Sequence, residues 1–539
     1  MRRLLPLLSA LALACARVPA PPPPAPDPAP VAPAPPPADR LAPIRADVEA
    51  LLAEQGEMLW RAWTSGAPAD PRQALAKRER LLEPGTLAAV REAAAAAKPG
   101  ERRPLALLEA FLVGERLARD TARSAEKLAA ARAQAAATWE GREIPARKLP
   151  ALLAAEADAG RRAAIEKALA QAEQRWAPAA EEHRRALLEA ARALGAPDLL
   201  ALAPLLRGEP ADALAARAQA VLAATRPAYV ALLDLVGRRE LGIPFEKLRS
   251  RDLPRLQALA HDGRAFPAGK ALQGGLATLR GLGIDLSAAP GFTLDAEARP
   301  GKDPRTLLLP VAVPGGVRLS LVPAGGAAEA RGVLRALGSA AFLTGIRAPE
   351  PELRLLSGVA LEAFGGLLEE LAGDPAWLAE HTGLSEHNLE PLVRAGAARR
   401  LHLVRELAAR LLLEVGRQRE PARAAELARA ACEQLLARPP TAEEVALFAA
   451  EPDPLLRSAD LLAGQLLAAQ AEGWLAAAGG PAWWRSPAAG ALLRGAFAPG
   501  SGPDAAGLAA AFGRPGLDAA ALLARTGLRA ERAGLRLPP

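Results

Sequence analysis

Apolar residues recur with helical spacing along most of this chain. From about Leu41 onward they return every three or four positions, which places them on one face of a helix. The clearest examples are Leu51, Leu52, Met58, Leu59 and Trp60, and later Leu401, Val404, Leu407, Leu411 and Leu412. Alanine, leucine, arginine and glutamate dominate these segments, and all four favour helix. The pattern predicts a mainly α body over residues 41–539, with these apolar stripes in its core.

Two local signals predict where helices begin. Thr441 followed by Glu444 has the spacing of a capping box, in which each side chain bonds the other residue's backbone N–H. Asp374 followed by Pro375 predicts an N-cap with proline at the first helical position.

One region departs from the helical pattern. Thr306–Val313 and Val317–Val322 are β-like apolar runs, and the Pro-Gly-Gly sequence at 314–316 between them suits a turn. We therefore expect a small hairpin or sheet at about 306–322 within the helical body. The segment Arg331–Ile346 then returns to helix.

The N-terminus has the order of an export signal. Arg2 and Arg3 precede a short apolar stretch over residues 4–14, too short to span a membrane as a helix. Ala12-Leu13-Ala14-Cys15 is similar to a bacterial lipobox, so residues 1–14 are expected to be a signal peptide and Cys15 the site of lipid attachment. The alternative is cleavage after Ala14, which would release a soluble secreted or periplasmic protein.

A linker rich in proline and alanine follows, over residues 15–40. Such a segment behaves as a stiff, extended spacer. With a lipid on Cys15 it would tether the helical body to a membrane of the cell envelope, on the periplasmic or outer side.

Composition narrows the candidate chemistry. The 539 residues include 67 Lys+Arg and 60 Asp+Glu, a formal charge of +7, and the two signs are interspersed. No basic stripe with stacking aromatics is present, so nucleic acid is not an expected partner. Two cysteines exclude a disulfide framework and a four-cysteine zinc site. Five histidines and one tyrosine restrict any catalysis that needs several of either.

Several stretches resemble the HExxH zinc peptidases of the thimet oligopeptidase, oligoendopeptidase and angiotensin-converting-enzyme type. The resemblance rests on their order and spacing over residues 41–539. It implies a large, nearly all-helical gluzincin-like fold with a central channel and a small sheet before the metal-binding helix. The stretches are 283–285, 299–305, the expected hairpin, 362–365, 374–378 and 483–487.

The motif that carries the chemistry of this family is absent. Two histidines at i and i+4 share a helix face and bind zinc, and the glutamate between them activates water. The matching segment here is Arg335-Ala336-Leu337-Gly338-Ser339, which keeps only the family's glycine, Gly338. The family's third ligand falls on Glu362, so one of three ligands remains and zinc is expected to be lost.

The remaining histidines and the tyrosine do not rebuild this site. No two of the histidines at 183, 261, 381, 387 and 402 are spaced i and i+4. His381 and His387 are expected at solvent-facing cap or loop positions. The family's oxyanion donors are C-terminal tyrosine or histidine side chains. A tyrosine would be expected near Leu461, whereas Tyr229 lies far upstream and no histidine follows His402.

Arg335 has two open interpretations. Its guanidinium could replace the metal by pairing with Glu362, or it could extend into solvent. Cys432 lies in an Ala/Leu-rich helical pattern and is expected to be a buried, unreactive side chain.

These observations favour an exported, lipid-anchored pseudoenzyme that has no catalytic residues and binds peptides, partner proteins or an active paralogue. One alternative is an active zinc oligopeptidase with an atypical metal site. The other is a structural envelope lipoprotein.

Overall fold

The computed structural model describes residues 37–259, 265–356 and 358–532. The expected signal peptide, Cys15 and most of the expected linker lie outside this part of the chain. Helix accounts for 71% of the structure and strand for 5%. The prediction of a mainly α fold is confirmed. The first helix begins at Pro37, a few residues before the boundary expected at Leu41.

The helices up to the central sheet lie in chain order between short loops. They are α1 (Pro37–Ser65), α2 (Arg72–Ala76), α3 (Pro84–Ala96), α4 (Arg102–Asp120), α5 (Ala122–Gln134), α6 (Leu149–Ala155), α7 (Ala159–Gln174), α8 (Ala177–Ala193), α9 (Ala203–Arg207), α10 (Ala211–Leu241), α11 (Leu253–Leu259) and α12 (Lys270–Gly281).

The helices after the sheet complete the body. They are α13 (Ala327–Gly345), α14 (Pro351–Leu355), α15 (Val359–Glu369), α16 (Pro375–Thr382), α17 (Glu386–Arg419), α18 (Ala424–Leu436), α19 (Ala442–Ala449), α20 (Arg457–Gly479), α21 (Pro487–Phe497), α22 (Ala505–Ala511) and α23 (Ala520–Arg532).

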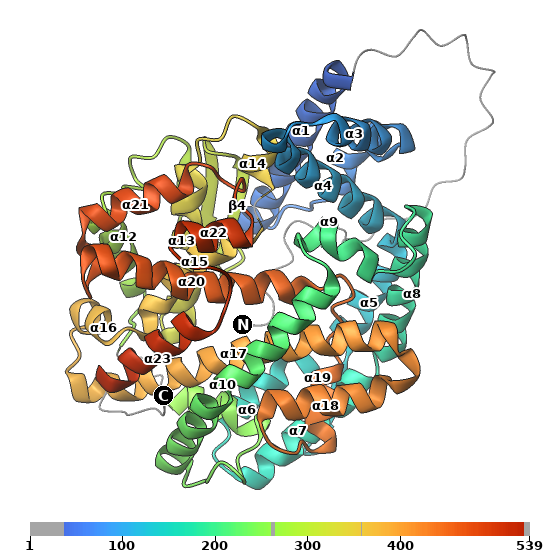
Figure 1. Cartoon of the computed structure of the whole chain (residues 1–539). Helices are drawn as coiled ribbons and strands as arrows, with labels where there is room; N and C mark the ends of the chain where they lie inside the picture. The colour runs from blue at the N-terminus through green and yellow to red at the C-terminus, as the bar shows by residue number, and fades with distance from the viewer. Residues whose placement is uncertain (1–36, 260–264, 357, 533–539) are drawn as a thin grey trace.

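Two large apolar clusters form the core. One joins the N-terminal helices α1, α3 and α4 to the sheet, α13 and α15. The other lies between the long helices α10 and α17, which pack along each other, and includes α18 and part of α20. In Figure 1 the blue helices α1–α4 lie at one side of the molecule and the orange-red helices α20–α23 at the other. Of the predicted apolar stripes, the buried residues are Leu51, Leu52, Leu401, Val404, Leu407 and Leu411. The others, Met58, Leu59, Trp60 and Leu412, are only partly buried.

Helix α15 lies between α13 and α20 (Figure 1). Glycines permit this close packing. A Cβ on Gly338 of α13 would lie 2.5 Å from the carbonyl oxygen of Phe364 in α15. A Cβ on Gly464 of α20 would lie 2.5 Å from the Cβ of Glu362. The three backbones therefore approach closely at the height of the expected metal site.

The sheet contains the predicted hairpin and one more strand. β4 (Leu307–Ala312) pairs antiparallel with β5 (Gly316–Ser320), with Leu308 opposite Leu319, so the hairpin is confirmed. A third strand, β3 (Phe292–Asp295), pairs parallel with β5 and gives the order β3-β5-β4. The sheet directly precedes α13, as the family resemblance implies.

A second hairpin shows that the expectation of a single β region is wrong. β1 (Ala136–Trp139) pairs antiparallel with β2 (Arg142–Pro145). Glu140 and Gly141 between them both have positive φ, 51° and 72°, as a two-residue turn of the type favoured in hairpins requires. Glutamate seldom adopts this conformation, so the turn carried no sequence signal.

Both predicted helix starts are confirmed. The Oδ1 of Asp374 accepts hydrogen bonds from the backbone N–H groups of Ala376 and Trp377, at 3.0 and 3.2 Å. Thr441 and Glu444 form the full capping box at the start of α19.

Helix α10 is the one helix of the described ranges that is long and apolar enough to cross a membrane. Half of its apolar window is buried inside the protein, and buried core helices of soluble proteins have the same composition.

Candidate functional site

The residues that the resemblance aligns with the zinc motif lie at the contact between α13 and α15. Arg335 and Ser339, four residues apart, face α15 on the same side of α13. A Cβ added to Gly365 of α15 would lie 2.5 Å from the Oγ of Ser339 and 3.2 Å from the Cγ of Arg335. Ala336, at the position of the family's glutamate, is buried in the core cluster. The positions matched by the resemblance therefore do meet in space.

Arg335 pairs with two carboxylates of α15. Its Nη1 donates to the Oε2 of Glu362 at 2.7 Å, and its Nε donates to the Oε2 of Glu369 at 2.6 Å. The ion-pair interpretation of Arg335 is confirmed. Glu362 and Glu369 are seven residues apart, so both project from one face of α15 toward α13.

A larger network of buried charges continues from Glu369. Arg399 donates to the Oε1 of Glu369 at 3.2 Å. The guanidinium of Arg529, on α23, bonds Glu370 at 2.9 Å and both carboxylate oxygens of Glu472 at 3.0 Å. Arg400 Nη1 lies 2.9 Å from Glu370 Oε2, an ion-pair contact that lacks the alignment of a hydrogen bond. The network ties α13, α15, α17, α20 and α23 together.

The electrostatics differ between the two partners of Arg335. Burial raises the pKa of Glu362, and the nearby Arg335 only partly offsets that effect. For Glu369, burial also acts to raise the pKa, but Arg335 and Arg399 outweigh it and the net pKa is lowered. The two carboxylates hold the pKa of Arg335 above its usual range despite the opposing effect of burial. The guanidinium is therefore permanently charged at this position.

Zinc does not fit this arrangement. A tetrahedral zinc site needs neutral imidazole, thiolate or carboxylate ligands. Here a permanent cation lies at the first ligand position, a hydroxyl at the second, and the remaining carboxylate is held by that cation. Within the described ranges no three or more His, Cys, Asp or Glu side chains are grouped so that they could hold a metal ion.

A cavity borders this network but is small. It lies between α13, α17 and α23, is lined by Arg331, Arg399, Arg400 and Arg529, and has a volume of about 20 Å³. That is room for about one water molecule. Burial next to Arg399 lowers the pKa of Arg331 to about 9. A central channel, which the resemblance also implied, is not shown by the structure.

The side chains of the other residues singled out in the sequence pack against other parts of the protein. Leu461, where the family's tyrosine was expected, is a partly buried side chain against the core of α10 and α17. The Tyr229 hydroxyl is 2.9 Å from the Nδ1 of His402 in that core, and burial holds its pKa well above the usual range. Cys432 is buried, as predicted, and burial raises the pKa of its thiol to about 12.

The remaining histidines of the described residues have different surroundings. The expectation of a solvent-facing position holds for His387, which is exposed near the start of α17. It is wrong for His381, whose ring packs against Trp377 with the ring centres 4.5 Å apart. His183 Nδ1 is 3.0 Å from the hydroxyl of Ser124. His261 lies outside the described residues.

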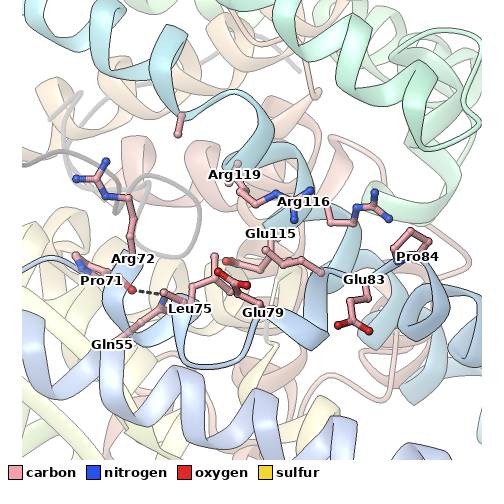
Figure 2. A pocket seen from close by; sticks show the side chains of 14 residues that line it. Gln55, Pro71, Arg72, Leu75, Glu79, Glu83, Pro84, Glu115, Arg116 and Arg119 are labelled. Carbon is pink, nitrogen blue, oxygen red and sulfur yellow. Dashed lines mark hydrogen bonds between the residues drawn. The ribbon is translucent and has the colours of Figure 1, made fainter. Parts of the chain in front are cut away.

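A much larger cavity lies among the N-terminal helices. Its volume is about 540 Å³, within the range of small-molecule sites. Figure 2 shows side chains of α4 facing those of the α2 region across it. Its apolar walls are Pro71, Leu75, Ala76, Leu82, Pro84, Ala118 and Ala122, and its polar lining is Gln55, Arg72, Glu79, Glu83, Glu115, Arg116 and Arg119.

Glu115 is the unusual residue of this cavity. Its side chain lines the cavity and is partly exposed. Burial raises its pKa to about 7. No hydrogen bond or ion pair joins it to any residue that the structure describes. A carboxylate in this condition is charged on only about half of the molecules near neutral pH.

Sequence reasoning missed Glu115 and most of the buried network. The network did leave a signal: Glu369 and Glu370 interrupt the apolar run of α15, and Glu362 lies seven residues before Glu369 on the same face. Charges on an apolar face need partners when they are buried. Glu115 left no such signal, because it lies in the C-terminal part of α4, where charged residues are frequent.

Comparison with known proteins adds no assignment. Neither a protein-family model nor a curated protein matches the chain.

Proposed function

We propose that this chain is a non-catalytic relative of the helical zinc peptidases that acts by binding. The observation that carries the proposal is the pairing of Arg335 with Glu362 and Glu369. In this arrangement the carboxylate that matches the family's third ligand is already neutralised by a guanidinium. Peptides, partner proteins or an active paralogue are the ligands that such a body would bind.

Export and lipid attachment are part of the same proposal. The apolar stretch at 4–14, Cys15 and the linker at 15–40 support a body tethered to the cell envelope. Incorporation of labelled palmitate into the chain, and its loss in Cys15→Ser, would test lipid attachment. A chain that is cleaved but unlabelled would instead support the soluble, secreted alternative.

Metal analysis tests the loss of catalysis. We expect the purified full chain to carry far less than one zinc and to leave a quenched fluorescent peptide library uncleaved with or without added zinc. Stoichiometric zinc with chelator-sensitive cleavage would overturn the proposal in favour of an active peptidase with an atypical site.

Restoring the motif gives a sharper test. We expect the triple variant Arg335→His, Ala336→Glu, Ser339→His to bind about one zinc per chain, because positions 335 and 339 both face Glu362. Arg335→His alone is the matched control and should bind none. A triple variant that folds and stays free of zinc would contradict the match to the HExxH positions.

The small volume beside Arg335 favours a second candidate, the structural envelope lipoprotein. A body whose former catalytic region is filled by ion pairs has no need of a ligand there. Its prediction is that a chain without lipid attachment perturbs the envelope, whereas variants of the binding surfaces do not.

A further inference from the structure

The cavity between α4 and the α2 region combines three properties. It is large, its walls are mostly apolar, and it contains a carboxylate without a partner. It is separate from the Arg335 network and takes no part in the expected peptidase site. Its chemistry therefore requires an explanation of its own.

Some of the charged side chains around the cavity form ion pairs with neighbouring residues, and those that do not are mostly acidic. Arg72 is held by Asp70 and Glu126, and Arg119 by Asp120. Arg116 and the three glutamates form no ion pair with the described residues. The acids come from three walls: Glu115 from α4, Glu79 from the 3-10 turn Glu79–Leu82, and Glu83 from the start of α3. The unpaired groups thus carry a net negative charge.

A partly buried carboxylate without a partner lowers stability, because it has lost some of its water contacts and gained no hydrogen bond in return. A cation placed beside Glu115 would remove this penalty. The apolar surfaces of Leu75, Leu82 and Pro71 would at the same time favour a ligand with a hydrocarbon body. The cavity is complementary to both features in one molecule.

We propose that this cavity binds an amphipathic organic cation, whose ammonium or guanidinium group pairs with Glu115 and whose apolar body covers Leu75 and Leu82. A free amine and the amino terminus of a short apolar peptide share this chemistry. The cavity volume accommodates either. The proposal stands independently of any relation to peptidases.

Three eight-carbon probes with different charges test the proposal on the full chain by calorimetry. We expect n-octylammonium to bind at least about tenfold more tightly than n-octanol, because a hydrogen bond to a charged group contributes more than a neutral one. Octanoate should bind most weakly. Equal affinity for octylammonium and octanol, or no binding of the cation at millimolar concentration, would overturn the proposal.

Variants identify the residue responsible. Glu115→Gln keeps the shape of the side chain and should weaken octylammonium at least about tenfold while leaving octanol unchanged. Glu109→Gln is the matched control, since Glu109 lies on the same helix, pairs with Arg91 and does not line the cavity. Leu75→Trp fills the cavity and should weaken both probes. An unchanged affinity in Glu115→Gln would contradict the assignment.

The pH dependence provides a second, independent readout. The cation binds the ionised carboxylate, and with the Glu115 pKa at about 7 its ionised fraction rises about tenfold between pH 6 and pH 8. Octylammonium affinity should rise by the same factor and become flat with pH in Glu115→Gln. Glu79, Glu83, Arg72, Arg116 and Arg119 are the other charged side chains that face the cavity.

A dipeptide amide distinguishes the two sources of the cation. If leucyl-leucine amide with a free amino terminus binds more tightly than octylammonium, the site is for peptides; the reverse order indicates a free amine. Acetylation of the dipeptide should abolish its advantage in either case. An acetylated peptide that binds as well as the free one would overturn the role of the cation. Zinc content is measured separately, so failure of the peptidase relation leaves this test intact.

Discussion

Two regions of this protein contain buried or partly buried charged side chains, and they differ in whether those side chains form ion pairs. Around Arg335 every carboxylate has an arginine partner, and the adjoining cavity measures about 20 Å³. Around Glu115 the carboxylate has no partner among the described residues, and the cavity measures about 540 Å³. The ion pairs of the first region connect neighbouring helices, whereas the second region has the features of a ligand-binding site.

The comparison teaches that enclosed charge alone does not identify a functional site. A buried pair that is fully matched contributes mainly to the arrangement of the helices, and removing one partner is costly. A ligand that pairs with an unpartnered carboxylate in a cavity removes the desolvation penalty of that carboxylate, and this contributes to the free energy of binding. The Glu115 cavity is therefore the stronger candidate for binding, although only the Arg335 region was visible in the sequence.

The largest expected effect is the loss of Arg335. Arg335→Met keeps the side chain's bulk but leaves Glu362 buried without its partner, while Glu369 keeps Arg399. We expect a loss of about 3–5 kcal/mol in the free energy of unfolding, measured by urea denaturation. Arg80→Met, at an exposed pair with Asp47, should leave the midpoint unchanged. Equal denaturation midpoints for the two variants would mean that the buried ion pairs of Arg335 stabilise the fold no more than the exposed pair of Arg80 and Asp47 does.

The next effect has the opposite sign. Glu115 has a folded-state pKa of about 7, above its unfolded value of 4.5. A carboxyl with a raised folded pKa adds stability that is fully present below pH 4.5 and is lost as the pH rises through 7. Glu115→Gln should therefore gain about 1–3 kcal/mol over the native chain at pH 8 and nothing at pH 4.5.

Thermal unfolding at the two pH values measures this difference. Glu109→Gln is again the control and should show no gain at pH 8. A Glu115→Gln chain that is less stable than the native chain at pH 8 would show that the carboxylate has a partner after all. The Glu115 region would then contain a paired carboxylate, as the Arg335 region does.

The sequence predicted the local features of the fold better than its long-range features. The helices, both helix starts and the hairpin at β4 and β5 follow from spacing and turn residues within a few positions. β3 escaped notice because its partner β5 lies beyond an intervening strand. The β1–β2 turn escaped because its first residue, Glu140, is an unusual one at positive φ.

The same limit applies to the candidate sites. Arg335 and Glu362 were singled out because the resemblance to the HExxH peptidases aligned them with ligand positions, and their opposite charges made pairing one of two open interpretations. Arg529 joins the network from the last helix, and no local pattern connects it to α15. The Glu115 cavity is built from α1, the α2 region and α4, so only the packing of these segments reveals it.

The smallest expected effect tests whether the Arg335–Glu362 pair adds net stability or only fixes how α13 and α15 pack together. Arg335→Met combined with Glu362→Met removes both charges and substitutes apolar side chains of similar length. Well-packed apolar replacements of a buried pair are often neutral in stability. We therefore expect the double variant to lie within about 1 kcal/mol of the native chain and to recover most of the loss caused by Arg335→Met alone.

Glu362→Met alone completes the cycle, and urea denaturation of all four chains measures the coupling. A double variant as unstable as Arg335→Met would mean that the guanidinium stabilises the fold mainly through Glu369. The most important partner of Arg335 would then be Glu369, in the network that runs toward Arg399 and Arg529, and not Glu362. The contrast with Glu115 would remain in either case. Both outcomes depend on ion pairs of Arg335, whereas Glu115 has no ion pair with any residue that the structure describes.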